Sequence, residues 1–71
     1  MKSLSLTSNI GKNIRDLRVK KGISQDRLSK LADLALNTIV KIESGKNRNP
    51  TIVTISRIAD SLKVPVDRLI K

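Results

Sequence analysis

Apolar residues recur at helical spacing along most of the chain, and the first such stretch begins near residue 8. Three of its apolar side chains share one helix face because they are separated by four and three residues: Ile10, Ile14 and Leu17. Thr7 or Ser8 can serve as the N-cap of this helix, and Gly22 can end it. The preceding residues show no sustained period, so we predict that residues 1–7 form a loosely ordered arm.

Two short helices follow, and the three residues Asp33-Leu34-Ala35 form a turn between them. The second helix begins after the N-cap Ser24, and three of its apolar residues share a face: Leu28, Leu31 and Ala32. The third helix is closed by Gly45 and turns two aliphatic residues toward the core: Ile39 and Ile42. The pattern therefore predicts two short helices on either side of a tight turn.

A fourth amphipathic helix and a short final turn complete the pattern. The run from Lys46 to Pro50 has two cations and no apolar residue before its proline, which predicts a solvated loop. Thr51 then caps the fourth helix, and Val64-Pro65 is expected to end it because the residue before proline avoids the α conformation. Its apolar residues lie at steps of three and four: Ile52, Ile55, Ile58, Ala59 and Leu62.

Length and composition turn this pattern into a fold class. A chain of 71 residues allows one compact domain and excludes a long catalytic scaffold. The chain is 38% hydrophobic and has no Phe, Tyr or Trp, so its core must be built from aliphatic side chains. Helices interlock such side chains better than a short sandwich does. We therefore predict an all-α fold, a compact bundle of four to five short helices over residues 8–71.

Charge and missing residue types narrow the function. Lys and Arg number 15 against 6 Asp and Glu, and the resulting net charge of +9 implies an acidic partner. The absence of Cys and His removes disulfides, thiolate metal sites and the commonest general base, so we expect no catalytic residues, no metal and no cofactor. No stretch approaches the roughly 18 apolar residues of a membrane span, and the N-terminus lacks an export signal. The expected location is the cytoplasm, away from membranes.

The turn and the residues around it indicate a particular motif. Two short helices joined by a tight turn are what a helix-turn-helix needs, and its second helix projects into the DNA major groove. The segment resembles the lambda-repressor-like family of Cro and phage-repressor (XRE) type, over Ile10 to Ile70. The residues that carry this resemblance are Gln25-Asp26-Arg27-Leu28-Ser29, Asp33-Leu34-Ala35, Ile39, Ile42-Glu43-Ser44-Gly45 and Asn49-Pro50-Thr51. The resemblance implies a helix-turn-helix DNA-binding domain.

The sequence departs from the family pattern at two positions of the turn. Asp33 stands where members usually carry Gly in a left-handed conformation, which Asp tolerates better than most residues. Ala35 stands where members prefer Ser or Thr as N-cap of the recognition helix. Because Ala cannot accept the capping hydrogen bond, we expect the start of that helix to be weakened by about 1 kcal/mol.

The helical period of the third helix predicts which of its residues face DNA. Leu34, Ile39 and Ile42 must face the core, so the remaining positions are candidates for base contacts: Leu36, Asn37, Thr38 and Lys41. An Asn can pair with adenine through two hydrogen bonds, a Lys can donate to guanine, and Leu or Thr can meet a thymine methyl. Leu36 can instead pack on the turn, Thr38 and Asn37 can be solvated surface residues, and Lys41 can be a cation of the general field.

Phosphate contacts are expected from helix N-termini and from cations beside the groove. Ser24 and Gln25 open the second helix, and the resemblance implies that Gln25 binds a backbone phosphate. Lys46, Asn47 and Arg48 follow the recognition helix, where the family's loop meets the same DNA strand. Six further cations are assigned to the general electrostatic field: Lys12, Arg15, Lys20, Lys21, Arg27 and Lys30.

Two further groups of residues are assigned to structure and assembly. The resemblance implies that Arg18 and Glu43 form a partly buried ion pair, which acts in folding because such a pair is mainly costly to break. Apolar residues near the C-terminus either form a dimer contact or simply close the core: Val64, Val66, Leu69 and Ile70.

The leading interpretation is a sequence-specific double-stranded DNA-binding transcriptional regulator, a repressor that acts as a homodimer on a two-fold operator. One short helix reads few base pairs, so occupancy against a genome of competing sites favours two half-sites. The alternative is a protein-interaction module of the same fold, such as an antitoxin or coactivator scaffold with an unknown partner protein. A salt-sensitive shift of a random duplex would separate the two interpretations.

Overall fold

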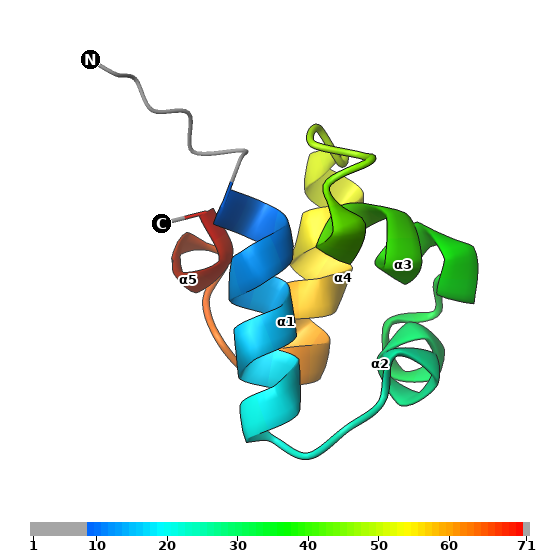
Figure 1. The fold of residues 1–71 in the computed structure, drawn as a ribbon. Helices are drawn as coiled ribbons and strands as arrows, with labels where there is room; N and C mark the ends of the chain where they lie inside the picture. The colour runs from blue at the N-terminus through cyan, green and yellow to red at the C-terminus, as the bar shows by residue number, and fades with distance from the viewer. Residues whose placement is uncertain (1–8, 71) are drawn as a thin grey trace.

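The computed structural model describes residues 9–70, which form five α-helices and no strand (Figure 1). They are α1 (Ile10–Lys20), α2 (Gln25–Ala32), α3 (Leu36–Ser44), α4 (Ile52–Leu62) and α5 (Asp67–Ile70). The predicted all-α bundle is confirmed. The arm predicted over residues 1–7, together with Ser8 and Lys71, lies outside the described residues.

Hydroxyl caps define two of the helix starts, as the sequence predicts. The Ser24 Oγ accepts a hydrogen bond of 3.0 Å from the backbone N–H of Arg27, and the Thr51 Oγ1 accepts one of 3.2 Å from that of Thr54. The start of α1 differs from the prediction because its N-cap is Asn9, whose side chain makes no capping hydrogen bond. The proposed caps Thr7 and Ser8 fall outside the described part.

Left-handed residues follow four of the helices. Gly22 and Gly45 have φ of 72° and 85°, and these glycines adopt it without steric cost. Among the non-glycine residues described, Asp33 (φ 55°) and Lys63 (φ 58°) share this conformation. The predicted end of the fourth helix at Val64-Pro65 is therefore wrong, because the left-handed Lys63 stops α4 at Leu62. The Val64 N–H then bonds back to the Ala59 carbonyl at 3.0 Å.

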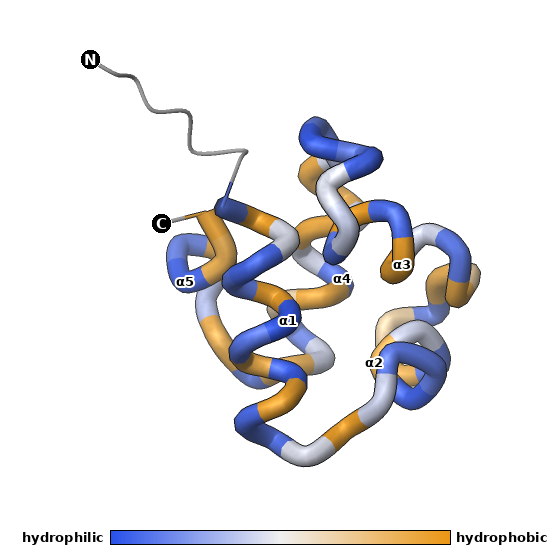
Figure 2. Tube along the Cα trace, in the orientation of Figure 1, coloured by the Kyte–Doolittle hydropathy of each residue, from blue (hydrophilic) through white to orange (hydrophobic). Residues whose placement is uncertain are grey.

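One aliphatic core holds the five helices together, and apolar segments recur along each of them (Figure 2). Its buried members are Ile10 and Ile14 of α1, Leu28 and Ala32 of α2, Ile39 and Ile42 of α3, Ile55, Ile58, Ala59 and Leu62 of α4, and Leu69 of α5. Leu17, Ile23, Leu34, Val64, Val66 and Ile70 pack around it, half-buried. Most of the predicted inner positions are thus confirmed.

Two predicted core residues are instead exposed. Leu31 is 49% exposed, because α2 buries the stripe formed by Leu28, Ser29 and Ala32 and leaves Leu31 at its outer edge. The Ser29 hydroxyl is compatible with burial because it donates to the Asp26 carbonyl at 2.7 Å. Ile52 is 65% exposed in the first turn of α4, ahead of the part of that helix that packs on its neighbours.

The first helix occupies the centre of the arrangement. It contacts α3 on one side and α5 on the other (Figure 1). A side chain at Gly11 would collide with the Ile42 carbonyl oxygen and place its Cβ 3.2 Å from the Glu43 Cα, so glycine allows α1 and α3 to cross closely. No helix within residues 9–70 is both long and apolar enough to span a bilayer.

Candidate nucleic-acid interface

The turn between α2 and α3 is built on Asp33. Its left-handed backbone (φ 55°, ψ 47°) lets the Leu34 N–H bond to the Ser29 carbonyl at 2.9 Å, which closes α2 and redirects the chain. Arg57 of α4 supports the turn from behind, because its Nη1 donates to the Asp33 carbonyl at 3.2 Å and lies 3.7 Å from the Asp33 carboxylate. The expectation that Asp accepts this conformation is confirmed.

The start of α3 lacks a side-chain cap. Ala35 occupies the N-cap position in an extended conformation (φ −66°, ψ 142°) and makes no side-chain hydrogen bond. The Thr38 N–H bonds only to the backbone carbonyl of Ala35, at 3.0 Å. The first turn of α3 therefore has the uncapped geometry that the sequence predicts.

Burial divides α3 into an inner and an outer side. Ile39 and Ile42 are 0% and 1% exposed and anchor the helix in the core. Three of the four predicted base-contact residues are exposed: Leu36, at 43%, Asn37 and Lys41. The fourth, Thr38, is half-buried. Sequence reasoning missed Val40, which is 38% exposed and one turn beyond Leu36. The helical period of the sequence also places Val40 opposite the core, so its exposure could have been predicted.

A buried ionic network fixes α3 to the two preceding helices. Two hydrogen bonds join the Arg18 guanidinium to the Glu43 carboxylate, Nε to Oε2 at 2.8 Å and Nη2 to Oε1 at 3.0 Å. Their side chains are 12% and 4% exposed, so the partly buried pair is confirmed. Arg18 Nη1 also donates to the Ile23 carbonyl at 2.8 Å. The hydrogen bond to Glu43 raises the pKa of Arg18, which stays charged at any physiological pH.

The first residues of α2 join the same network. The Gln25 Nε2 donates to the Glu43 Oε1 at 3.1 Å, so one amide hydrogen of the predicted phosphate ligand is already bound inside the protein. Its second amide hydrogen is the one left for a ligand. Ser24 uses its oxygen to cap α2, and a hydroxyl that accepts a hydrogen bond keeps its own proton as a donor.

The loop between α3 and α4 is shaped by its own hydrogen bonds. The Asn47 N–H bonds to the Lys41 carbonyl at 3.0 Å, and the Asn47 Oδ1 accepts the Asn49 N–H at 3.0 Å. The Arg48 Nε donates to the Gly45 carbonyl at 3.2 Å, while Lys46 and Arg48 remain exposed. The loop thus presents two cations beside the end of α3, and it holds Asn47, which is half-buried, mainly for its own folding.

The C-terminal apolar residues do not all face outward. Leu69 is 0% exposed and belongs to the core, so its assignment as a dimer contact is wrong for this fold. Its backbone is also held from α1, because the Asn13 Nδ2 donates to the Leu69 carbonyl at 2.8 Å. Val64, Val66 and Ile70 are half-buried around that core and retain some exposed surface.

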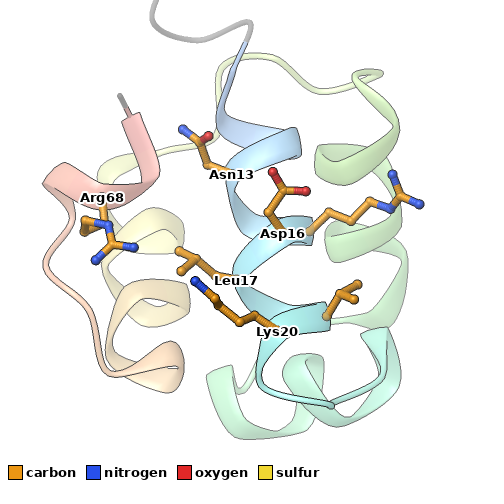
Figure 3. Close-up of a pocket in the computed structure, with 7 residues that line it drawn as sticks. Asn13, Asp16, Leu17, Lys20 and Arg68 are labelled. Carbon is orange, nitrogen blue, oxygen red and sulfur yellow. The ribbon is translucent and has the colours of Figure 1, made fainter.

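A hollow of about 710 Å³ lies where α1 faces α5. Figure 3 shows Leu17 and Lys20 of α1 pointing toward α5, whose Arg68 points back across the gap. Residues 9–70 contain no group of three or more Asp, Glu, His or Cys side chains able to hold a metal ion. The lining of this hollow combines three cations, Arg15, Lys20 and Arg68, with Asp16 and two apolar residues, Leu17 and Val19, so it is a mainly basic cleft separate from the exposed face of α3.

Comparison with known proteins gives a consistent result. The helix-turn-helix family model matches residues 14–69. The uncharacterized HTH-type transcriptional regulator RghRB of Bacillus subtilis (strain 168) is 36% identical over 62 residues, which are 87% of this chain and 45% of RghRB. The chain therefore spans less than half the length of that relative.

Solved structures share the arrangement of the helices. The restriction-modification controller protein C.AhdI of Aeromonas hydrophila is 30% identical, with a TM-score of 0.83 over 89% of this chain and 94% of that one. The N-terminal DNA-binding domain of SinR from Bacillus subtilis is 31% identical, with a TM-score of 0.84 over 87% and 90% of the two chains. SinR has also been solved in complex with DNA, and that structure matches with a TM-score of 0.84.

Proposed function

The chain belongs to the lambda-repressor-like helix-turn-helix family, and on that premise we propose that it is a sequence-specific double-stranded DNA-binding transcriptional regulator. One observation carries the proposal most directly. The helix α3 exposes Asn37 and Lys41, one turn apart, while Ile39 and Ile42 anchor its inner side in the core. A short helix held from behind, with donors on its free side, suits reading of the major groove.

Base contacts are assigned to the exposed side of α3. Asn37 pairs with the N6 and N7 positions of an adenine, and Lys41 donates to O6 or N7 of a guanine. Leu36 and Val40, exposed at 43% and 38%, supply an apolar surface for thymine methyl groups. Thr38 is half-buried and lies at the edge of this set, where its hydroxyl or methyl group reaches a base or a sugar.

Backbone phosphates are held on either side of α3. The N-terminus of α2 offers the Ser24 hydroxyl, the second Gln25 amide hydrogen and the positive end of the helix dipole. The α3–α4 loop offers Lys46 and Arg48, with Asn47 setting the shape of the loop. These contacts fix the register of the protein on the duplex and carry no sequence information of their own.

We further infer that the protein represses transcription by occupying a two-fold operator as a homodimer. A reading helix with five exposed or partly exposed candidates covers only a few base pairs, and two half-sites multiply its selectivity. Val64, Val66 and Ile70 are the apolar residues near the C-terminus with surface left for a second copy. SinR and C.AhdI, a DNA-binding regulator and a controller protein, are built on the same fold.

Selection of bound duplexes from a random library tests the proposal. We expect recovery of two copies of one short motif in inverted orientation, with centres about 34 Å apart, one turn of DNA. Retention of no duplex above background would contradict DNA binding. A single unrepeated motif would contradict the homodimer, and binding of all duplexes alike would contradict sequence specificity.

A further inference from the structure

A second hollow, of about 320 Å³, lies on the α3 side of α1. The N-terminal half of α1 forms one wall, and the end of α3 with the following loop forms the other. Its polar and charged lining comes from Lys12 and Arg15 of α1, Glu43 and Ser44 of α3, and Asn47 and Arg48 of the loop. Gly11 is part of the α1 wall, and its close crossing with α3 brings the two walls together.

The charge around this hollow is unbalanced. Three cations from two elements, Lys12, Arg15 and Arg48, gather at its walls. Glu43 is the carboxylate in the lining, and it already accepts two hydrogen bonds from Arg18 and one from Gln25. Lys12 pairs with Asp16 at 2.9 Å, but both side chains are more than half exposed, so water screens that pair. An arrangement of this kind favours an anion.

The end of α3 does not oppose an anion here. A helix C-terminus carries partial negative charge on its last carbonyls. In this protein the Gly45 N–H bonds to the Ile42 carbonyl, the Asn47 N–H to the Lys41 carbonyl and the Arg48 Nε to the Gly45 carbonyl. Those hydrogen bonds cover the Lys41 and Ile42 carbonyls of the last turn of α3 and the Gly45 carbonyl that follows it, and three full cationic charges outweigh what remains of the dipole.

We propose that this hollow binds a DNA backbone phosphate, with Lys12 and Arg15 of α1 and Arg48 of the loop as its donors. The proposal rests on the proposed function, because a duplex whose groove holds α3 runs past the adjoining loop. It assigns to α1 a direct part in DNA binding, in place of the general-field role expected for Lys12 and Arg15. This phosphate is a different one from those held at the N-terminus of α2. The protein would therefore contact a longer stretch of the DNA backbone than its reading helix alone.

A charge-matched pair of double variants tests the assignment. Lys12→Gln with Arg15→Gln removes two cations from the hollow beside α3, and Arg15 also borders the cleft between α1 and α5. Lys20→Gln with Arg68→Gln removes two from the cleft between α1 and α5 (Figure 3). All four side chains are exposed, and far-UV circular dichroism checks that both proteins keep the helical fold. Each variant and the wild type are titrated with the selected duplex over a range of salt concentrations and probed by phosphate-ethylation interference.

The expected result separates the two faces of α1. The first variant loses interference at one phosphate per half-site, and its plot of log K against log salt becomes shallower by about two. The second keeps the full interference pattern and a nearly unchanged slope. Equal changes of slope in both variants, or an interference pattern that the first variant leaves intact, would overturn the proposal. If the wild type binds no duplex, the proposed function itself is the part that fails.

Free inorganic phosphate is the other source of the same ligand chemistry. Titration of the protein alone with millimolar phosphate, followed through the backbone amide signals of Asn47 and Arg48, distinguishes the two. We expect only small, unsaturated shifts, because the hollow is open and its cations are exposed. Saturable shifts without DNA would identify a small-anion site and overturn the assignment to duplex backbone.

Discussion

Glu43 is the residue on which three helices converge. Its carboxylate accepts hydrogen bonds from Arg18 of α1 and Gln25 of α2 while its own backbone belongs to α3. With a side chain only 4% exposed, it has little water to replace those partners. The position of α3 relative to the N-terminus of α2, and so of the base-reading residues relative to the phosphate donors, depends on this one carboxylate.

Glu43→Ala should therefore destabilise the protein strongly. Removing the carboxylate leaves the Arg18 guanidinium charged in a site that is only 12% exposed, and breaking such a pair costs about 3–5 kcal/mol. Because the pKa of Arg18 is raised, the charge is present at every pH below the alkaline extreme, and the loss should not vary with pH near neutrality. Thermal unfolding measures the effect. Asp60→Ala, on an exposed face of α4, is the control and should change the midpoint little; equal small effects would contradict a structural role of the pair.

Asn37→Ala should relax base preference at one position of each half-site. A good bidentate contact is worth about 1–3 kcal/mol at its own base pair, while unrelated duplex is held mainly through phosphates. Titration against an operator series with each base pair changed in turn measures the profile. Asn9→Ala removes an exposed amide at the start of α1 and should leave the profile intact. An unchanged profile for Asn37→Ala would remove this residue from the interface.

At the scale of elements, α1 and α3 cross so closely at Gly11 that any side chain there should lower the free energy of unfolding. Gly11→Ala gains about 1 kcal/mol of helix propensity, but its Cβ meets the backbone of Ile42 and Glu43, which cannot rotate away. Overpacking of this kind costs about 1–3 kcal/mol, so we expect net destabilisation. Urea denaturation gives the free energy of unfolding. The exposed neighbour Lys12→Ala serves as the control, and a stabilised Gly11→Ala would show that the helices separate easily.

The uncapped start of α3 gives a prediction of opposite sign. Ala35→Thr supplies the missing capping oxygen and should stabilise the domain by about 1 kcal/mol, which corresponds to roughly 4–8 °C in the thermal midpoint. Ala35→Val has almost the same shape without the oxygen, so it should not stabilise. Calorimetry compares the two variants with the wild type. Equal midpoints for Thr and Val would mean that the N-terminus of α3 is satisfied by water.

Helix boundaries were predictable where the sequence carries a recognisable capping residue. A Ser or Thr before an amphipathic stretch is a direct capping signal, and Ser24 and Thr51 both act as predicted. The end of α4 was misplaced because a lysine gives no sign of the left-handed conformation that Lys63 adopts. Leu31 was misplaced because its periodic spacing fits the inner stripe, which the neighbouring Ser29 occupies once its hydroxyl is satisfied within the helix.

At the scale of the whole molecule, charge decides how binding responds to salt. The net charge of the chain is +9, and its cations should release counterions from a duplex when they neutralise its phosphates. The logarithm of the binding constant should therefore fall linearly with the logarithm of the salt concentration, with a slope of about 0.9 per phosphate neutralised. With about six such contacts, affinity should fall on the order of 10³-fold between about 50 and 200 mM salt. Fluorescence anisotropy of a labelled operator measures the slope. A flat response would contradict a phosphate-based interface.

The sequence predicted which residues of the candidate site are exposed, but it did not predict most of the contacts between them. The exposed side of α3 follows from helical period, and the Arg18–Glu43 pair from the resemblance. The contact of Gln25 with Glu43, the support of Asp33 by Arg57 and the hollow shared by α1 and the loop each join residues far apart in the chain. A single sequence contains no periodic signal for such pairs, since they arise only when the helices pack.

The aliphatic core has a consequence for how this protein is observed. With no Phe, Tyr or Trp anywhere in the chain, its peptide bonds are its main ultraviolet chromophore, and it is nearly dark at 280 nm. Concentration must be determined by refractometry or amino-acid analysis, and near-ultraviolet dichroism reports nothing of tertiary packing. The lack of protein fluorescence is useful in a complex, because the emission of a fluorescent base analogue such as 2-aminopurine then comes from the nucleic acid alone. Each base of an operator can be watched in turn without background from its partner.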